Sequence, residues 1–303
     1  MLPPLSLANL VNLRMLWLDY CELGDIAILK DLNNNLEILS LRGSNIEVLP
    51  SEIGQLTRLR LLDLGNCKKL TEIPQGVISN LSRLEELYIL DDFKPWEATR
   101  GNKERTKVNL DELGKLTQLT TLQIHIPNVM LLPEDFCFEN LIRFKISMGK
   151  EYGFYETYSK SCKLCGVSLM DKFIVLFLRA EELHLEKIDG LQEVMHDRGG
   201  EGSLMELHGL NPSGFFNNLI QLTIQDCRLK YLFSLSCARG FPRLQRLEIL
   251  DCEMMEAIVG IEEEKDEDEL SSHVINFSQL EYLCLENLPK LISFYCKVEK
   301  MTT

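Results

Sequence analysis

The chain has 303 residues, of which 46 are acidic and 32 basic, giving a formal net charge of −14 with 45% hydrophobic residues. This composition is typical of an ordered, acidic, soluble protein. The longest uninterrupted apolar run, Phe173 to Leu178, is far shorter than the roughly 18 residues of a membrane-spanning helix. An acidic chain without a basic face is repelled by phosphate backbones, so we do not expect a nucleic-acid partner.

A pattern of aliphatic residues recurs along the chain. Leucine or a similar residue occupies the first, fourth and sixth positions of each copy, and several copies carry cysteine at the ninth position. Copies start at Leu13, Leu36, Leu59, Leu84, Leu119, Leu141, Ala180, Leu219, Leu244 and Leu280. The sequence therefore predicts about ten structural repeats.

A second regularity supports the same register. A leucine or phenylalanine lies three residues before nine of the starts, at Leu10, Leu56, Leu81, Leu116, Phe138, Phe177, Phe216, Phe241 and Phe277. The second repeat has Asn33 at this offset instead. Two independent patterns thus agree although the spacing between repeats varies.

The alternation within each repeat indicates a strand. Side chains at the fourth and sixth positions point to one face and become buried, while those at the fifth and seventh positions point to the other face. Return segments bend at Pro50, Pro74 and Pro133, which favours irregular or 3₁₀ structure there. The pattern is similar to a leucine-rich-repeat horseshoe. We therefore expect an α/β solenoid with a parallel concave strand ladder and an irregular, 3₁₀ or helical convex side.

In chain order, we expect one solenoid over residues 1–303. It comprises regular repeats at 1–91, a basic inserted loop at 92–109, repeats at 110–149, a second inserted loop at 150–172, irregular repeats at 173–260, an acidic loop at 261–272, and a last repeat with a tail at 273–303. Neither end has the polar cap that repeat arrays usually carry, so we expect the chain to be part of a longer protein.

Segments 36–89 and 241–270 resemble the leucine-rich-repeat region of plant nucleotide-binding disease resistance proteins of the coiled-coil type. The second segment combines a cysteine-containing repeat, the residues MEAIV and an acidic loop. This resemblance implies perception of a pathogen effector or of a guarded host protein, together with autoinhibition through the nucleotide-binding domain of the parent receptor. It also implies a cytoplasmic location, which agrees with the lack of a basic secretory-signal region at the start of the chain.

The nucleotide switch itself is not expected in this chain. A phosphate-binding loop needs the pattern GxxxxGK followed by serine or threonine. The two Gly-Lys pairs, at Gly114 and Gly149, have Asn109 and Phe144 in place of the first glycine. We therefore expect no cofactor and no enzymatic activity.

The concave face is the main candidate for partner binding, because its aromatic and arginine side chains are of the types that anchor protein interfaces. Its candidate residues are Trp17, Asp19, Arg42, Asp63, Tyr88, Gln123, His125, Lys145, His184, Glu186, Thr223, Gln225 and Glu248. The basic loop supplies a second candidate surface with Lys94, Arg100, Lys103, Arg105 and Lys107. The alternative for both sets is that they are ordinary solvated surface.

The cysteines and histidines are further candidates for chemistry. Cys21, Cys67, Cys227 and Cys252 occupy the ninth repeat position, where a small packing residue is expected. Cys162 and Cys165 form a lone CxxC pair, which lacks the four ligands of a zinc site. The five histidines show no helical spacing with a nucleophile, so they favour neither a hydrolase nor a protease.

Other functions remain open alongside the immune-receptor reading. The runner-up is a stand-alone leucine-rich-repeat scaffold, such as the substrate-receptor arm of a ubiquitin ligase. An extracellular receptor is third, because the possible glycan acceptors Asn80 and Asn276 each precede a predicted core residue. The sequence leaves open which effector or host protein is recognised, whether sensing is direct, and the oligomeric state.

Overall fold

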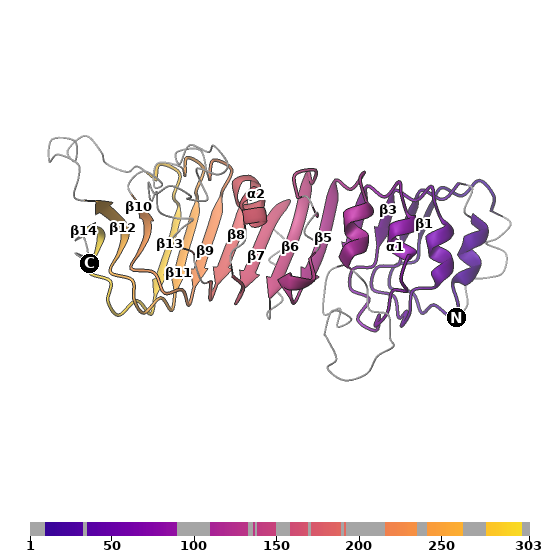
Figure 1. The fold of residues 1–303 in the computed structure, drawn as a ribbon, viewed down its shortest axis with the longest axis horizontal. Helices are drawn as coiled ribbons and strands as arrows, with labels where there is room; N and C mark the ends of the chain where they lie inside the picture. The colour runs from indigo at the N-terminus through magenta and orange to yellow at the C-terminus, as the bar shows by residue number, and fades with distance from the viewer. Residues whose placement is uncertain are drawn as a thin grey trace. The chain divides into compact units, whose positions relative to one another are not determined.

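The structure is a computed structural model. It describes residues 10–32, 35–89, 110–132, 136, 138–149, 158–168, 171–188, 191, 216–234, 241–262 and 277–298. The chain divides into two compact units, unit 1 at Met1–Phe154 and unit 2 at Tyr155–Thr303. Each unit is a stack of coils, and each coil has a strand on one side and a return segment on the other (Figure 1).

Unit 1 contains a ladder of six parallel strands. They are β1 (Met15–Trp17), β2 (Ile38–Ser40), β3 (Leu61–Asp63), β4 (Glu86–Ile89), β5 (Thr121–Ile126) and β6 (Arg143–Gly149), and each pairs with the next in chain order. Equivalent repeat positions lie opposite one another, as in the pair Leu39 and Leu62. The repeat register predicted from the sequence is therefore the strand register.

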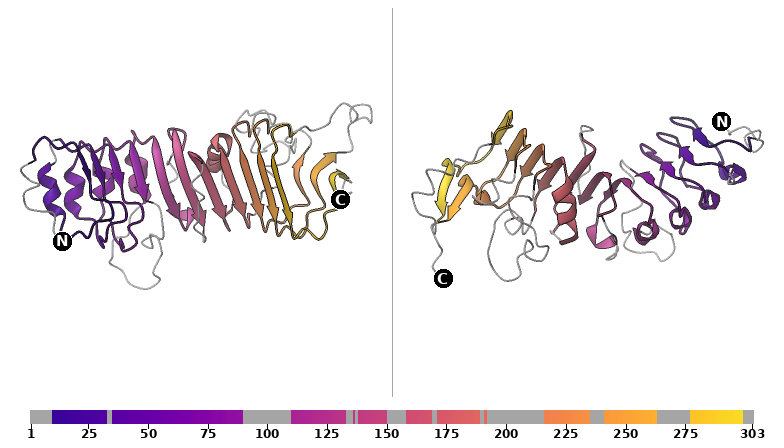
Figure 2. Two further views of the ribbon diagram at one scale, coloured as in Figure 1. Left: turned by 180° about the vertical axis from the view of Figure 1, so that it is seen from behind. Right: turned by 90° about the horizontal axis from the view of Figure 1, so that it is seen from above.

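Short helices form the return side of unit 1 (Figure 2). They are η2 (Ala27–Leu32), η3 (Ser51–Gln55), α1 (Val77–Asn80), η5 (Leu110–Lys115) and η6 (Val129–Leu131). Pro50 directly precedes η3, in agreement with the predicted bend. The side chain of Glu112, on η5, is only 4% exposed and accepts hydrogen bonds from the backbone N–H groups of Gly76 (2.6 Å) and Ser79 (2.9 Å) at the start of α1.

A continuous apolar spine holds the coils of unit 1 together. The fourth-position residues Leu39, Leu62 and Leu87 are fully buried, and Leu122 and Phe144 are each 1% exposed. Burying one such side chain contributes roughly 1.5–3 kcal/mol. A single coil cannot cover its own leucines, so this stabilisation depends on neighbouring coils.

Unit 2 has a ladder of five parallel strands, ordered β7, β8, β9, β11 and β13. Their bounds are β7 (Lys160–Cys165), β8 (Glu182–Glu186), β9 (Gln221–Gln225), β11 (Arg246–Leu250) and β13 (Tyr282–Glu286). The helix α2 (Asp171–Arg179) lies between β7 and β8 in the chain. Leu183, Leu222 and Leu247 are fully buried, whereas Leu283 is 43% exposed, since among the described strands of this ladder β13 pairs with β11 alone.

Residues 150–172 were predicted to form an inserted loop, but Lys160–Cys165 within this range form the ladder strand β7. Its core positions are filled by Cys162 and Leu164, which are 1% and 0% exposed. The repeat pattern missed this strand because Ser159 stands at the first position and Glu156 at the offset where the other repeats have leucine or phenylalanine. That residues 1–303 form one solenoid stays a prediction.

The return side of unit 2 contains a second parallel sheet, which the sequence analysis did not predict. Its strands are β10 (Tyr231–Ser234), β12 (Ala257–Glu262) and β14 (Ser293–Val298). These segments are rich in β-branched and aromatic residues, which favour extended structure over 3₁₀ turns.

Phenylalanines fill the space between the two sheets of unit 2. The rings of Phe216 and Phe241 stack with centroids 4.8 Å apart, and Phe233 lies 4.5 Å from Phe241. Phe216 and Phe241 occupy the predicted offset three residues before a repeat start, and both are buried. Leu10 holds the same offset in the first repeat but is 47% exposed.

The eighth residue adopts a left-handed backbone conformation in eight of the described repeats. Positive φ values occur at Tyr20, Gly43, Asn66, Gly166, Lys187, Asp226, Asp251 and Asn287. In these repeats the residue turns the chain out of the strand. Asparagine, aspartate and glycine tolerate the conformation, which accounts for their recurrence at this position.

Candidate functional site

The candidate site is built on the side chains that point away from the apolar spine. They stand at the third, fifth and seventh repeat positions of the ladder strands, and we call them the ladder face of each unit. Parallel pairing aligns equivalent positions into rows, so residues far apart in sequence become neighbours.

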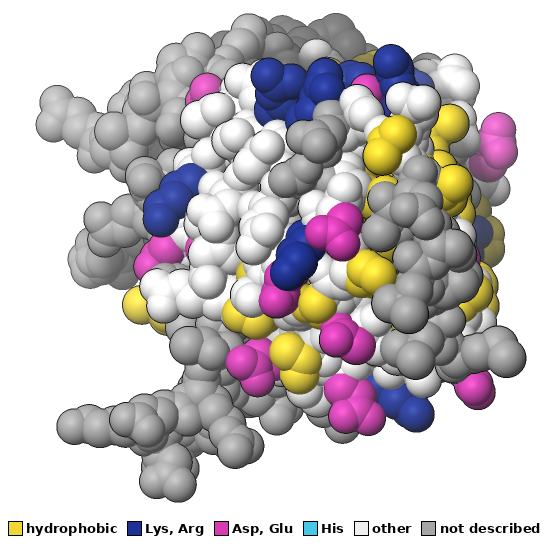
Figure 3. Space-filling model, turned by 90° about the vertical axis from the view of Figure 1, so that its right-hand side faces the viewer, with side chains coloured by type: hydrophobic (Ala, Val, Ile, Leu, Met, Phe, Trp, Pro, Cys, Tyr) yellow, Lys and Arg dark blue, Asp and Glu magenta, His cyan; other side chains and the backbone are white. Residues whose placement is uncertain are grey.

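The ladder face of unit 1 begins with exposed apolar side chains. Met15 and Trp17 on β1 are 57% and 59% exposed. Met15 lies in register with Ile38, and Ile38 with Leu61, so the three form one row. We call Met15, Trp17, Ile38 and Leu61 the apolar strip. Hydrophobic side chains at the surface are also visible on the side of the molecule shown in Figure 3.

Alternating charges border the apolar strip. Arg60 donates two hydrogen bonds of 2.8 Å to the carboxylate of Glu85 and lies 4.0 Å from Glu37, which is itself 3.7 Å from Arg14. The bidentate contact with Arg60 lowers the pKa of Glu85. Because these ion pairs are exposed, they contribute little to the stability of the fold, and their main effect is to orient the charged side chains along the edge of the apolar strip.

Asp19 and Arg42, at the seventh repeat position, make the other edge of the apolar strip polar as well. Arg42 lies 3.7 Å from the carboxylate of Asp63, which accepts a 2.8 Å hydrogen bond from the Gly65 N–H. Burial raises the pKa of Asp63 above its ordinary value despite the nearby Arg42. The hydroxyl of Ser40 donates to Asp19 on the neighbouring coil. Ser40 lies in register between Trp17 and Asp63, so these polar contacts adjoin the apolar strip.

Tyr88 marks the end of the apolar strip. Its hydroxyl donates to Glu86, whose carboxylate lies 3.0 Å from Arg143. Burial raises the pKa of Tyr88, so the phenol stays protonated and acts as a donor. Further along, Gln123 and Lys145 are half-buried and His125 is buried at 8% exposure.

The ladder face of unit 2 is a polar network. Ser161 donates a 2.7 Å hydrogen bond to Glu182, and Thr223 donates a 3.1 Å hydrogen bond to Glu248. Arg246 lies 2.8 Å from Glu248, and its guanidinium stacks 3.7 Å over the ring of Tyr282. Gln225 donates a 3.3 Å hydrogen bond to Asp251.

His184 lies within this network. Its Nε2 atom is 3.8 Å from a Glu186 oxygen, beyond hydrogen-bonding range, while Lys187 donates a 2.9 Å hydrogen bond to the other oxygen of Glu186. Burial, together with the Lys163 ammonium, lowers the pKa of His184 to about 4. Burial would raise the pKa of Glu186, but Lys187, together with Cys165 and Lys163, lowers the pKa below its ordinary value.

The structure thus brings several predicted residues close together. Arg42 forms an ion pair with Asp63, Thr223 donates a hydrogen bond to Glu248, and His184 lies 3.8 Å from Glu186 without a hydrogen bond. The structure leaves Trp17 exposed. The basic-loop residues Lys94, Arg100, Lys103, Arg105 and Lys107 lie outside the described residues, as do residues 263–272 of the acidic loop. Partner binding by either predicted set stays a prediction.

The sequence-based prediction missed the third-position residues of the ladder face and the outward-facing residues of β7. Met15, Ile38 and Leu61 stand at the third repeat position, which the analysis did not consider although the strand alternation assigns it to the same face as the fifth. Lys163 was missed because its strand, β7, was not predicted. Aligning the third residue of each repeat would have revealed the row of apolar side chains.

Three of the four ninth-position cysteines, Cys67, Cys227 and Cys252, show the predicted packing role, whereas the prediction was wrong for Cys21, which is exposed. The thiol of Cys67 donates to the Leu41 carbonyl at 3.1 Å, and that of Cys227 to the Leu185 carbonyl at 3.8 Å, so each links its coil to the preceding one. Cys67, Cys227 and Cys252 are free and buried, while Cys21 is free and exposed. Among the described residues, no group of three or more His, Cys, Asp or Glu side chains is placed to hold a metal ion.

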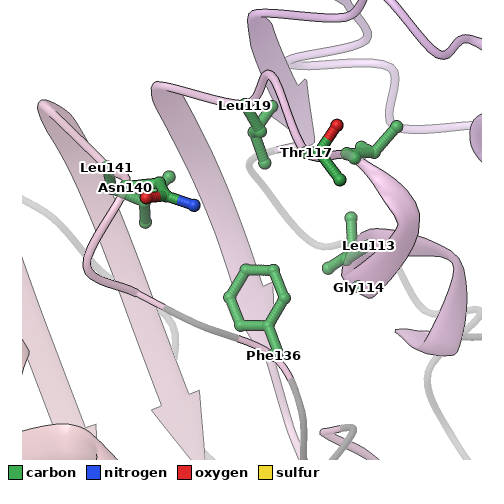
Figure 4. Close-up of a pocket in the computed structure, with 8 residues that line it drawn as sticks. Leu113, Gly114, Thr117, Leu119, Phe136, Asn140 and Leu141 are labelled. Atoms are coloured by element: carbon green, nitrogen blue, oxygen red, sulfur yellow. The ribbon is translucent and has the colours of Figure 1, made fainter.

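A small cavity of about 100 Å³ lies in unit 1 beside η5 (Figure 4). Its walls are mainly apolar and include Leu113, Leu119, Phe136 and Leu141. This volume is too small for a peptide. Within the described ranges, no helix has the length and apolar character to cross a membrane.

Comparison with known families places two matches on the chain. Residues 5–145 match the family described as "Leucine-rich repeat region". Residues 204–302 match the family described as "Plant disease resistance protein RPS2-like, leucine-rich repeats". The two matched ranges contain most of the ladder strands of both units.

Individual proteins agree with these matches. A disease resistance protein of Arabidopsis thaliana is 31% identical over 153 residues, which are 50% of this chain and 15% of that protein. TMV resistance protein N of Nicotiana glutinosa is 39% identical over 75 residues, which are 24% of this chain and 6% of that protein. The chain therefore spans less than a fifth of each of these relatives.

A solved structure shows the same fold. The leucine-rich-repeat protein of Leptospira interrogans superposes with a TM-score of 0.53 and 19% sequence identity, covering 93% of this chain and 74% of that one.

Proposed function

This chain is a leucine-rich-repeat region of the kind found in plant disease resistance proteins, and from that premise we propose that it perceives a pathogen effector or a guarded host protein. We further propose that it restrains the nucleotide-binding domain of its parent receptor, and that it acts in the cytoplasm. A role in protein interaction suits the ladder, which displays a long row of side chains to a partner without any catalytic arrangement among the described residues.

The exposed apolar strip is the observation that carries this proposal. A tryptophan and a methionine that are each more than half exposed lie beside Ile38 and Leu61 and are bordered by charges on both sides. Aromatic and methionine side chains surrounded by a polar rim are typical of the residues that contribute most to protein–protein affinity.

The proposal is tested by capture of the partner. We expect the full chain carrying both Met15→Ala and Trp17→Ala to bind the nucleotide-binding domain of its parent receptor at least tenfold more weakly than wild type. The matched control carries Val48→Ala and Met130→Ala, which remove exposed apolar side chains from the return side of unit 1. Binding measured by calorimetry should be unchanged in this control.

Autoinhibition adds a second readout in the parent receptor. Loss of restraint by the Met15→Ala and Trp17→Ala variant is expected to speed the release of bound nucleotide without an effector. Equal binding and equal nucleotide release in wild type, variant and control would refute the role of the strip.

A further inference from the structure

Two hydrogen-bond donors on the first two strands of the unit 2 ladder, β7 and β8, lack an acceptor. Lys163 and His184 stand directly opposite each other on β7 and β8 at the fifth repeat position. The Nε2 atom of His184 is buried and has no hydrogen-bond partner. Among the described residues, the Lys163 ammonium makes no hydrogen bond and no ion pair.

The carboxylates around this pair are already engaged. Glu186 accepts from Lys187 at 2.9 Å, and Glu248 accepts from Thr223 and Arg246. Glu182 accepts from Ser161 at 2.7 Å. The nearby acids therefore do not satisfy the two donors, although Glu186 is within electrostatic reach of both.

The protonation states suit an incoming acceptor. With a pKa of about 4, His184 is neutral at pH 7, and a neutral imidazole that carries its proton on Nε2 donates one hydrogen bond. The lysine ammonium offers up to three donors. The pair thus offers one charged and one neutral donor about one strand spacing apart.

We propose that Lys163 and His184 form a recognition point for a carboxylate side chain, an aspartate or glutamate, of the protein partner. The proposal rests on the protein-binding function proposed above and names the chemistry of the contact in unit 2. A carboxylate fits better than a phosphate, because Glu182, Glu186 and Glu248 repel a doubly charged group more strongly than a singly charged one. Hydrogen bonds to a carboxylate also compensate the buried His184 nitrogen, which is costly when unpaired.

The test follows the ring signals of selectively labelled histidines in the full chain by NMR. The probe is N-acetyl-glutamate methylamide, and the matched control is the corresponding glutamine derivative, which has the same shape but no charge. We expect the glutamate probe to shift the His184 signals saturably in the millimolar range. His125, which lies in unit 1, serves as an internal reference and should not respond.

Variants separate recognition from general effects of charge. Lys163→Met should weaken the response at least tenfold, whereas Lys230→Met should leave it unchanged, because Lys230 pairs with Glu256 away from the ladder face. A circular dichroism spectrum of Lys163→Met that matches wild type shows that the variant is folded. If the variant does not fold, the comparison of the glutamate and glutamine probes in wild type tests the proposal instead.

Three results would overturn the proposal: equal shifts with glutamate and glutamine probes, an unchanged response in folded Lys163→Met, or inorganic phosphate acting at lower concentration than the glutamate probe. Each leaves the partner-capture experiment on Met15 and Trp17 unaffected. Failure of the proposed carboxylate contact at Lys163 and His184 can thereby be distinguished from failure of the proposed function.

Discussion

At the scale of single residues, His184 makes the protein sensitive to acid. Its pKa is about 4 in the folded chain, while an unfolded histidine titrates near 6.5. Above pH 6.5 the ring is neutral in both states and the shift has no effect on stability. As the pH falls below 6.5, the unfolded chain binds a proton that the folded chain does not, so stability is lost progressively down to about pH 4.

This shift predicts a measurable difference between wild type and His184→Gln. Between pH 7 and pH 5, we expect wild type to lose about 2 kcal/mol more of its unfolding free energy than the variant. Urea unfolding at the two pH values provides the measurement, and the other titrating groups cancel in the comparison. A difference between the two proteins that does not change with pH would contradict the assignment.

The sequence predicted which residues face away from the spine, but not how exposed they are. Ser40 and Ser147 stand at predicted outward positions yet are fully buried. Exposure depends on the partners that the ladder places beside a residue. Thr223 pairs with Glu248, and Ser161 pairs with Glu182. The number of residues between the two partners differs from one pair to the other, so a single repeat length does not predict both pairs.

At the scale of elements, Glu112 couples two consecutive return segments of unit 1. Its buried carboxylate on η5 accepts two backbone hydrogen bonds at the start of α1. We expect Glu112→Ala to destabilise unit 1 by about 2 kcal/mol, because it leaves two N–H groups without their charged acceptor. Glu112→Gln keeps one acceptor oxygen and should cost less.

Lys115→Ala is the control for this measurement, since Lys115 lies on the same helix but is exposed. Thermal or urea unfolding of the three variants should rank them in the order control, glutamine, alanine by increasing loss of stability. Equal stability of Glu112→Ala and wild type would show that the contact does not hold the two segments together.

The turn after each strand offers a second test at this scale. Gly43 and Gly166 both have positive φ, but only at Gly43 would an added Cβ overlap with another side chain, the ring of Tyr20. We expect Gly166→Ala to cost about 1 kcal/mol from backbone strain alone, and Gly43→Ala to cost more. In a Tyr20→Ala background, the cost of Gly43→Ala should fall towards that of Gly166→Ala.

Urea unfolding of the single and double variants forms a complete cycle for Gly43 and Tyr20. Independent effects of the two substitutions would contradict the packing of Tyr20 over the turn of the next coil.

Elements with a regular pattern were predictable, and those that broke it were not. β3 and β4 follow from leucine or isoleucine at the first, fourth and sixth positions. β7 has serine and cysteine at two of these positions, so its strand was invisible to the pattern although its core is equally buried. The sheet of β10, β12 and β14 depends on pairing between return segments, which repeat spacing alone does not encode.

At the scale of the whole molecule, stability resides in contacts between neighbouring coils within each unit. The buried fourth-position residues contact the equivalent residues of adjacent strands, so no coil is stable alone. The same stacking displays the ladder face as a continuous surface. The sequence predicted this architecture because it depends on repetition, whereas the apolar strip depends on which coils carry methionine, isoleucine and leucine at the third position.

The account is tested most directly by hydroxyl-radical footprinting of the full chain with and without the nucleotide-binding domain of its parent receptor. Trp17 and Met15 are exposed on the ladder face, and Met130 is 75% exposed on the return side. Binding through the ladder face predicts that oxidation of Trp17 and Met15 slows several-fold in the complex while oxidation of Met130 stays constant. Protection of Met130 with no change at Trp17 and Met15 would contradict it.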